Sequence, residues 1–204
     1  MSPRTYNRRS RLAAAEEIRR RIVRATSELH AQHGGLGTTH EMIARHAGVS
    51  LPTVYKYFPT RNDLIPHCTG LVLSEAPVKL DESAFVGKDD VPSRLGALAR
   101  RAFELYDYAA PWLRWSARDA TELPALRAMH DEAARGRAAL VRAALAPGFD
   151  RAPPRRLVAL SAVLLDFTSW QALTEDGFTS QGAAAAVGEA LASLYSATRK
   201  EKDA

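Results

Sequence analysis

The sequence lacks several features that would point to other classes of protein. Its 204 residues include one cysteine, Cys68, which excludes a disulfide within the chain and fits a reducing cytoplasm. Beside His67, this thiol is either a small buried side chain or a redox switch. No apolar run approaches the ~18–20 residues of a membrane span, and no apolar core follows the basic N-terminus as in a secretory signal. We therefore expect a cytoplasmic protein that does not enter a membrane.

The chain also lacks the alternation of apolar and polar residues that is typical of β-strands. Alanine, leucine and arginine dominate instead, and all three favour helix. Hydrophobic residues make up 46% of the chain and charged residues 25%, and both fractions are ordinary for a soluble globular protein. We therefore expect an all-α protein with about nine helices.

Motifs of common enzymes and cofactor sites are missing as well. The glycine-rich run at residues 34–37 follows no strand, so it does not form a dinucleotide-binding loop. Neither Gly-x-Ser-x-Gly nor His-Glu-x-x-His occurs in the sequence. His30 and His33 lie three residues apart at a helix end, but no obvious third metal ligand accompanies them. We expect no catalysis, no cofactor and no metal.

Positive charge is concentrated at one end of the chain. The net charge is +5, from 28 Lys and Arg against 23 Asp and Glu. Residues 1–66 hold 11 Lys or Arg and 5 Asp or Glu, a balance of +6, so the remaining residues carry −1. A polyanionic partner for this first third is the simplest explanation, although a solvated basic surface would give the same count.

Residues 39–64 carry the most informative pattern. They fit two short helices joined by a turn at Gly48, where glycine permits a positive φ. Ala44 is small where the two helices approach each other, and Val54 fills the space between them. Ser50 can cap the second helix. This pattern predicts a helix-turn-helix, a motif whose second helix reads the DNA major groove.

Helices are predicted over most of the remaining chain. The expected ranges are 13–32, 39–46, 50–58, a start at 60–63, 92–109, 111–146 with a split near 121–124, 154–175 and 179–198. Gly34 ends the first helix, and residues 75–92 form a loop or linker. Pro66 lies beyond the first turn of the fourth helix, where it marks either a local bend or a hinge.

The helix-turn-helix resembles that of the TetR family of bacterial transcriptional repressors. The resemblance is specific over residues 13–65, and beyond them it rests mainly on helix count and chain length. It implies a three-helix DNA-binding domain at 12–66 and a larger helical regulatory and dimerisation domain at 67–204. A basic arm at 1–11 is expected to be disordered, and it either contacts DNA or has no specific role. The matching positions are Thr39, Ile43, Ala44, Ala47, Gly48, Val49, Ser50, Thr53, Val54, Tyr55, Tyr57, Phe58, Arg61 and Leu64.

The resemblance also implies which residues contact DNA. They are Thr39, Ser50, Leu51, Thr53, Tyr55, Lys56, Tyr57 and Arg61. Those at helix starts and the two tyrosine hydroxyls would bind phosphates, while Thr53 and Lys56 could face base edges or the backbone. Leu51 departs from the family pattern, so contact with a thymine methyl would replace a hydrogen bond. His40 replaces an aliphatic residue and either packs in the small core or lies partly exposed.

A dimer interface is predicted near the C-terminus. The helix at 154–175 is apolar around most of its circumference, so it is expected to be buried on two sides. Small residues in the helix at 179–198 allow close approach, and two such helices from each subunit would form a four-helix interface. A large monomeric core is the alternative. The predicted interface residues are Leu160, Leu164, Phe167, Leu191, Leu194 and Tyr195.

A ligand pocket is predicted where aromatic and charged residues gather. Asp166, inside an apolar helix, would be costly to bury without a partner. The predicted pocket residues are Tyr106, Trp112, Trp115, Arg118, Asp166 and Trp170. Packing in the core is the alternative for the aromatic residues, and a hydrogen-bond or arginine partner is the alternative for Asp166.

The family resemblance implies that the protein is a ligand-responsive repressor. It would bind a palindromic operator as a homodimer and be released by an unknown small molecule. The alternative is an architectural DNA-binding protein without an effector, which would barely discriminate between an operator and bulk DNA. A helical interaction module with a vestigial helix-turn-helix is a third interpretation.

Overall fold

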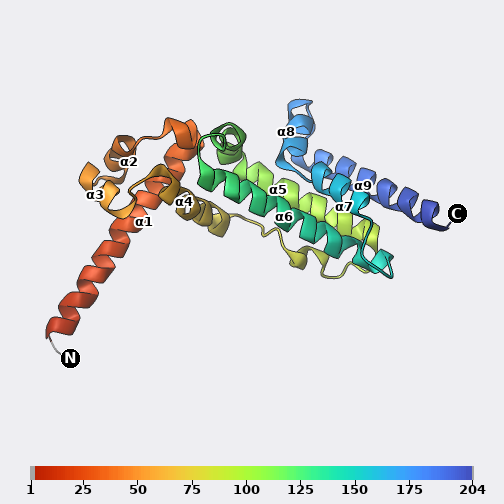
Figure 1. The fold of residues 1–204 in the computed structure, drawn as a ribbon, viewed down its shortest axis with the longest axis horizontal. Helices are drawn as coiled ribbons and strands as arrows, with labels where there is room; N and C mark the ends of the chain where they lie inside the picture. Colours follow the sequence, from red (N-terminus) through yellow and green to blue (C-terminus); the bar gives the residue numbers. More distant parts are fainter. Residues whose placement is uncertain (1–2, 204) are drawn as a thin grey trace. The chain divides into compact units, whose positions relative to one another are not determined.

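The computed structural model of the protein describes residues 3–203, with side chains described for residues 10–200. Within this range the chain forms nine α-helices and two short 3-10 helices and no strand, which confirms the all-α prediction (Figure 1). The helices are α1 Pro3–Gly37, α2 His40–Ala47, α3 Leu51–Tyr57, α4 Arg61–Glu75, η1 Glu82–Phe85, α5 Val91–Asp119, α6 Pro124–Leu145, η2 Ala146–Gly148, α7 Arg155–Leu164, α8 Phe167–Glu175 and α9 Ser180–Asp203.

The chain divides into two compact units. Unit 1 comprises Met1–Glu75 and Pro111–Met129, and unit 2 comprises Ala76–Ala110 and His130–Ala204. The sequence predicted a boundary at 66/67, but α4 continues through Pro66 to Glu75, and the change of unit falls inside the predicted 75–92 linker. Unit 1 also includes a second segment from later in the chain, which no local pattern indicated.

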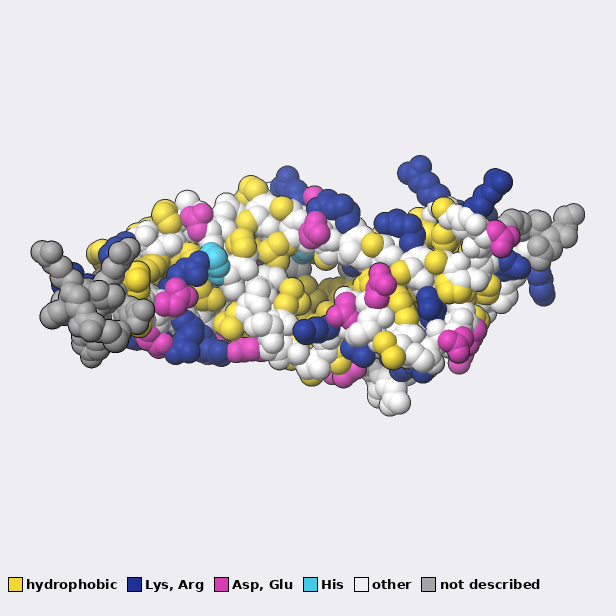
Figure 2. Space-filling model, turned by 90° about the horizontal axis from the view of Figure 1, so that it is seen from below, with side chains coloured by type: hydrophobic (Ala, Val, Ile, Leu, Met, Phe, Trp, Pro, Cys, Tyr) yellow, Lys and Arg dark blue, Asp and Glu magenta, His cyan; other side chains and the backbone are white. Residues whose placement is uncertain are grey.

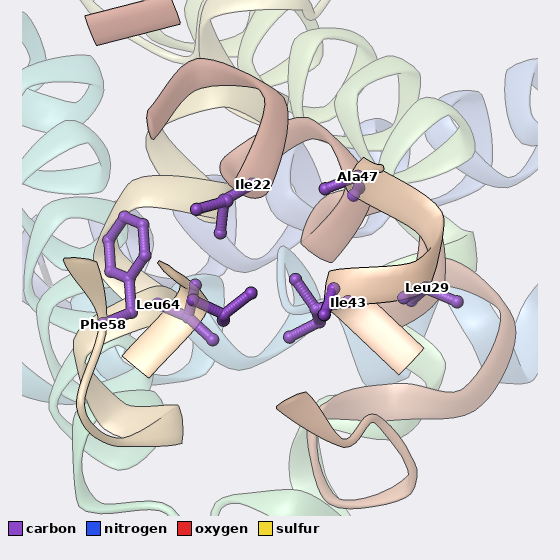
Figure 3. Packing of buried hydrophobic residues seen from close by; sticks show 9 residues of the cluster. Ile22, Leu29, Ile43, Ala47, Phe58 and Leu64 are labelled. Carbon is purple, nitrogen blue, oxygen red and sulfur yellow. The ribbon is translucent and has the colours of Figure 1, made fainter. Parts of the chain in front are cut away.

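The core of unit 1 joins α1 to the helix-turn-helix. Its fully buried members include Ile22, Ile43 and Val54, each 0% exposed. The labelled side chains of Figure 3 point toward one another from α1, α2 and the chain around Phe58 and Leu64. Such close packing fixes the angle between the two helices of the motif, since interior side chains leave little free volume.

The first helix is longer than the sequence predicted. α1 begins at Pro3, so residues 3–11 are helical where a disordered arm was expected. Proline is tolerated at a helix start because its missing N–H would have no partner there, and arginine and alanine sustain the helix onward. Gly34 interrupts the regular backbone with φ 74° and ψ 175°, as the predicted glycine end requires, and one further helical turn reaches Gly37.

Two predictions about helix ends in the later chain were wrong. α5 runs from Val91 to Asp119 without ending before Pro111, and the chain passes from unit 2 to unit 1 at that proline. The helix predicted over 154–175 is broken after Leu164. Asp166 is therefore not inside a helix: its carboxylate accepts the Thr168 N–H and caps α8.

The structure shows one buried face of α7. Leu157 and Val158 are buried on that face, whereas Leu160 is 42% and Val163 63% exposed within the single chain. Burial of the other face against a second copy stays a prediction. No single helix in the described range is long and apolar enough to cross a membrane, although the bent pair α7–α8 meets that test by length and composition.

Candidate nucleic-acid interface

The helix-turn-helix is defined by capped helix ends. Thr39 Oγ1 accepts the Met42 N–H at 3.2 Å, and Ser50 Oγ accepts the Thr53 N–H at 3.3 Å. Gly48 has φ 62°, the left-handed conformation predicted for the turn. Each cap satisfies a backbone group that has no partner within its own helix, so the two helix starts are held in defined positions.

Arg21 supports the turn from α1. Its guanidinium donates to the carbonyls of Ala47 and Gly48. These two carbonyls belong to the end of α2 and the turn, where carbonyl groups have no N–H donor within the helix. Local sequence patterns do not predict this contact, because Arg21 and Gly48 lie 27 residues apart.

The fourth helix begins with a capping box formed by Thr60 and Asp63, at the predicted helix start of 60–63. Asp63 Oδ2 accepts from both the N–H and the hydroxyl of Thr60 at 2.8 Å, and the Asp63 N–H donates to Thr60 Oγ1. The hydrogen bonds from the Thr60 hydroxyl and N–H hold the pKa of Asp63 below its usual value. Arg61, beside this cap, donates one N–H to the Leu36 carbonyl at 3.2 Å. Its remaining donors are on a partly exposed side chain.

All eight predicted DNA contacts lie at the protein surface. Three side chains are exposed, Ser50, Tyr55 and Lys56, and the other five are partly exposed. Val54, between them in the same helix, is 0% exposed and packs in the core. α3 therefore has one buried side and one side available to a partner. Each of the eight residues is therefore accessible to DNA, and the contacts themselves stay predictions.

Several predicted contact residues of α3 also make contacts within the protein. Leu51 and Tyr57 pack against the core from its edge, so part of each side chain is already committed to the fold. Lys56 Nζ lies 5.9 Å from the centre of the Tyr57 ring, within cation–π range. Tyr55 is 46% exposed and stacks on His40 with ring centres 4.4 Å apart.

His40 links α2 to the end of α3. It is buried, and its Nε2 lies 2.9 Å from the Phe58 carbonyl oxygen. The imidazole is therefore a core residue with a polar partner, one of the two placements that the sequence allowed. Its stacking on Tyr55 was not predicted, because the sequence does not show which face of the ring is covered.

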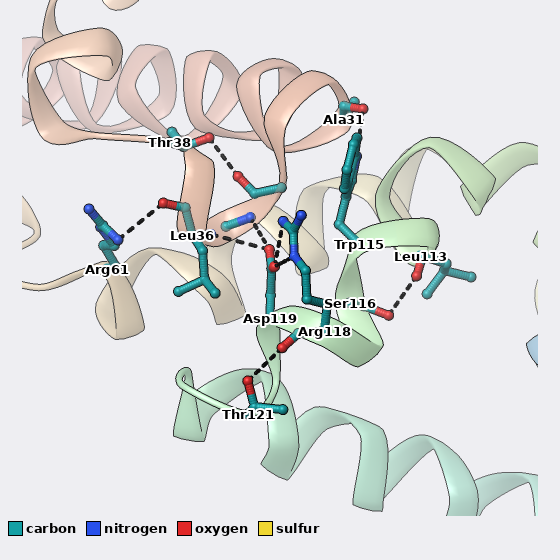
Figure 4. A network of polar contacts seen from close by, with 12 residues as sticks. Ala31, Leu36, Thr38, Arg61, Leu113, Trp115, Ser116, Arg118, Asp119 and Thr121 are labelled. Carbon is teal, nitrogen blue, oxygen red and sulfur yellow. Dashed lines mark hydrogen bonds and ion pairs between the residues drawn. The ribbon is translucent and has the colours of Figure 1, made fainter.

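The predicted pocket residues are divided between the two units. Trp112, Trp115 and Arg118 belong to unit 1 and contact α1 or Asp119. Figure 4 shows the contacts of Trp115 and Arg118. The indole N–H of Trp112 donates to the Ser27 carbonyl at 2.8 Å, and that of Trp115 to the Ala31 carbonyl at 3.3 Å. These three side chains support the helix-turn-helix unit.

Tyr106, Asp166 and Trp170 form a cluster in unit 2. The Tyr106 hydroxyl donates to the Leu165 carbonyl at 2.9 Å, and burial raises its pKa to about 12. Asp166 pairs with Arg137, the arginine partner that the sequence left open. The Trp170 N–H donates to Ser180 Oγ at 2.9 Å. The cluster is thus internally hydrogen-bonded.

A buried hydroxyl lies on the neighbouring helix. Ser161 of α7 is 0% exposed, and its Oγ has no hydrogen-bond partner among the described residues. A separate hollow of about 310 Å³ in unit 2 is lined by residues that include Val86, Lys88, Arg100 and Glu104. None of the predicted pocket residues lines that hollow.

The predicted dimer residues differ in exposure. Leu160 is exposed, whereas Leu191 is 0% exposed and buried within its own unit. Tyr195 packs edge-on against Phe149, with ring centres 5.9 Å apart. On the face drawn in Figure 2, hydrophobic side chains lie at the surface among Lys and Arg toward the C-terminus. Leu191 is therefore removed from the predicted interface, because a fully buried side chain leaves no surface for a partner.

Cys68 is a buried thiol. It is 4% exposed, its Sγ lies 3.4 Å from His30 Nδ1, and burial raises its pKa to about 11. Burial lowers the pKa of His30 to about 4. Both groups are therefore neutral at pH 7, which disfavours the redox switch because the thiolate is the reactive form. In the described range no three potential ligands come together as a metal site.

Sequence comparison identifies the N-terminal segment. Residues 22–68 match the family described as bacterial regulatory proteins, tetR family. The match covers the second half of α1, the helix-turn-helix and the start of α4. No curated protein sequence matches the chain.

Solved structures share the fold over most of the chain. A TetR-family transcriptional regulator from Streptomyces coelicolor is 19% identical, with a TM-score of 0.64 over 91% of this chain and 85% of that one. The multidrug binding protein EbrR, complexed with imidazole, is 23% identical, with a TM-score of 0.59 over 86% and 88%. The ketosteroid transcriptional regulator KstR2 of Mycobacterium tuberculosis is 15% identical, with a TM-score of 0.52 over 87% and 94%.

Proposed function

From a TetR-family DNA-binding domain in the fold of TetR-family regulators, we propose that this chain is a ligand-responsive transcriptional repressor. It binds a palindromic operator as a homodimer in the cytoplasm, and a small molecule releases it. The observation that carries the proposal is the surface of α2 and α3. From the N-cap of α2 through α3 to the first residue of α4, the eight predicted contact residues lie at the surface of a motif with both helix starts capped.

Charge supports DNA as the partner. Residues 1–66 carry a balance of +6, whereas the rest of the chain carries −1. Lys56 is exposed on α3, and Arg61 at the start of α4 keeps most of its N–H donors. Phosphate contacts by such residues supply affinity, while contacts to base edges from α3 would supply sequence preference.

Exposed apolar side chains support the dimer. Leu160 and Val163 lie one turn apart on α7 with 42% and 63% of their surface exposed. Burial of such surface against a second copy is favourable by roughly 25 cal/mol per Å². Two copies related by a two-fold axis would present two recognition helices to the two halves of a palindrome. Substituting Val163→Asp should shift the oligomer toward monomer in sedimentation experiments.

The effector site is proposed beside Tyr106, Asp166 and Trp170 in unit 2. Aromatic rings and a paired carboxylate occur there together, and the buried Ser161 Oγ on α7 has a hydrogen bond left to make. The hollow at Lys88 and Arg100 is open to solvent and flanked by charges, so it fits an aromatic or amphipathic effector less well.

Selection of duplexes from a random pool tests the proposal. The full chain should enrich sequences with two-fold symmetry, and it should bind them at least ~10³-fold more tightly than bulk DNA. Equal binding to bulk DNA would instead support the architectural alternative. A compound screen on the selected duplex, read by fluorescence anisotropy, then tests release by a small molecule.

A further inference from the structure

The break in α1 creates unpaired backbone groups. Gly34 has φ 74° and ψ 175°, a conformation that residues with a side chain rarely adopt. The helical stretch that resumes at Gly35 has first amides without an acceptor in their own helix, as at any helix start. An acceptor from elsewhere in the chain is therefore required in unit 1.

Asp119, the last residue of α5, is that acceptor. Its Oδ2 accepts the Gly35 N–H at 2.6 Å and the Leu36 N–H at 3.2 Å. Its Oδ1 accepts from Nε and Nη2 of Arg118, at 2.8 and 2.7 Å. The residue is 0% exposed (Figure 4). The carboxylate thus caps a helical turn that lies 84 residues earlier in the sequence, and all of its acceptor positions are used.

The two glycines allow this close approach. A Cβ placed on Gly34 would lie 2.6 Å from Asp119 Oδ2 and 3.0 Å from Trp115 Cβ. A Cβ on Gly35 would lie 2.9 Å from Leu123 Cδ1. A side chain at Gly34 would therefore clash with Asp119 and Trp115 at the end of α5, whereas a side chain at Gly35 would displace the end of the Leu123 side chain.

Other polar contacts hold the same segment. The indoles of Trp112 and Trp115 donate to carbonyls of α1, one turn apart on that helix. The N–H of Ala125, in the first turn of α6, donates to Asn62 Oδ1 of α4 at 3.1 Å. Residues 111–129 are thus joined to both α1 and α4 inside unit 1.

The capped turn leads directly into the proposed DNA-binding surface. The Leu36 carbonyl accepts from Arg61 Nη1, and Thr38 Oγ1 donates to the Gly34 carbonyl at 2.7 Å. Thr39, the next residue, caps α2. A shift of the turn would therefore move a predicted phosphate contact at the start of α2 and another at the start of α4.

We propose that Asp119 is a positioning residue for DNA binding, which caps the Gly35 turn and so sets the places of Thr39 and Arg61. This inference rests on the proposed function of the helix-turn-helix. It assigns to the end of α5, which sequence reasoning placed near a ligand pocket, a role in the DNA-binding unit. Asp119 does not touch DNA; it acts through the turn that it caps.

Asp119→Asn in the full chain tests this proposal. The amide keeps the volume of the carboxylate but has one acceptor oxygen and no charge. Asp90→Asn is the matched control, because it makes the same charge change at an exposed cap of α5 in unit 2. Affinity for a selected duplex is measured by fluorescence anisotropy at several salt concentrations, with helix content checked by circular dichroism.

Asp119→Asn should lower the affinity about tenfold or more and reduce the salt slope by about 1, because the Arg61 phosphate contact is lost. Asp90→Asn should leave both unchanged. A purely structural role of Asp119 would reduce the amount of folded protein and lower the apparent affinity at an unchanged slope. That result, or an unchanged affinity, would overturn the proposal.

Hydrogen exchange without DNA separates this inference from the proposed function. The amides of Gly35, Leu36 and Met42 should exchange at least about tenfold faster in Asp119→Asn, while those of residues 18–29 in α1 keep their rates. Unchanged exchange at Gly35 and Leu36 would overturn the inference even if the wild-type protein binds its operator. Failure of the wild-type protein to bind any duplex would instead refute the proposed function.

Trp115→Phe serves if Asp119→Asn does not fold. It removes the N–H that donates to the Ala31 carbonyl together with the five-membered ring of the indole, and it keeps an aromatic ring and the Cβ beside Gly34. The affinity and the salt slope should change in the same direction by a smaller amount. Wild-type values for both quantities in a folded Trp115→Phe protein would count against the proposal.

Discussion

The two compact units use their polar and apolar side chains differently. In unit 1, Asp119, Trp112 and Trp115 hydrogen-bond to backbone groups more than 80 residues away, and the capped helices surround a closed core. In unit 2, Leu160 and Val163 are exposed, and the buried Ser161 Oγ has no partner within the described residues. Unit 1 also exposes Leu12 and Leu73, so the difference between the units lies in their polar groups: among the described residues, the buried side-chain oxygen left without a partner belongs to Ser161 of unit 2.

The difference indicates why one protein would need both units. A surface that reads a regular duplex must hold its contacts in fixed positions, and cross-links within the chain provide this. A surface that associates with a second copy or a small molecule must leave apolar area and hydrogen-bonding groups available. The following predictions address this contrast.

The largest expected effect comes from the core of unit 1. Ile43→Ala removes a side chain that is 0% exposed, and it should lower the free energy of unfolding by about 2–4 kcal/mol through lost burial and a cavity. Urea unfolding, followed by the fluorescence of Trp112 and Trp115 in a Trp170→Phe background, measures it. Val163→Ala, on the exposed side of α7, is the control and should cost under about 1 kcal/mol in a monomer. Equal losses of unfolding free energy in the two variants would contradict the proposed difference between the two units.

The buried His30 should make unit 1 sensitive to acid. Burial lowers its pKa from 6.5 to about 4, so the unfolded chain binds a proton between these values and the folded chain does not. Stability is therefore fully present above about pH 6.5 and falls as the pH drops toward 4, by up to about 3 kcal/mol. His30→Gln should flatten this part of the curve of unfolding free energy against pH. A wild-type curve that is already flat there, with His30 titrating near 6.5 by NMR, would refute the assignment.

A smaller effect is expected from a single surface cation. Lys56→Ala should weaken operator binding about tenfold and reduce the salt slope by about 1, since one phosphate or base contact is lost. Lys79→Ala removes the same charge from an exposed position in unit 2 and should change neither quantity. Anisotropy titrations at several salt concentrations give both values. Equal losses in the two variants would mean that only net charge matters.

The smallest effect concerns Cys68. Because burial raises its pKa to about 11, alkylation of the folded protein should be far slower than in urea. Mass spectrometry after timed exposure to iodoacetamide measures the rate. Labelling at the rate of a free thiol would show that α4 opens around Cys68 and that unit 1 is less closed than described.

Local patterns in the sequence predicted the helix-turn-helix well. The cap at Ser50, the turn at Gly48 and the core position Val54 all depend on neighbours within a few residues. Such short-range rules apply before the rest of the chain is placed. For this reason the motif and its surface side could be predicted together.

Long-range and competing effects explain what the sequence did not predict. The contact between Asp119 and Gly35 joins positions 84 residues apart, and no periodicity records it. The sequence pattern placed Asp166 inside one apolar helix. In the structure its carboxylate caps α8 and pairs with Arg137, so one helix ends before Asp166 and another begins after it. At Pro111 the packing of a long helix outweighed the preference of proline for helix starts. The predicted pocket was divided because neighbouring residues of one helix serve different units.

Hydrogen exchange of the full chain with and without a selected operator duplex tests the central claim most directly. If unit 1 reads DNA, added duplex should slow the exchange of amides at 38–43 and 50–61, while amides of unit 2 outside its dimer contacts keep their rates. An operator that leaves 38–61 unchanged, or that protects mainly residues 130–200, would contradict the account.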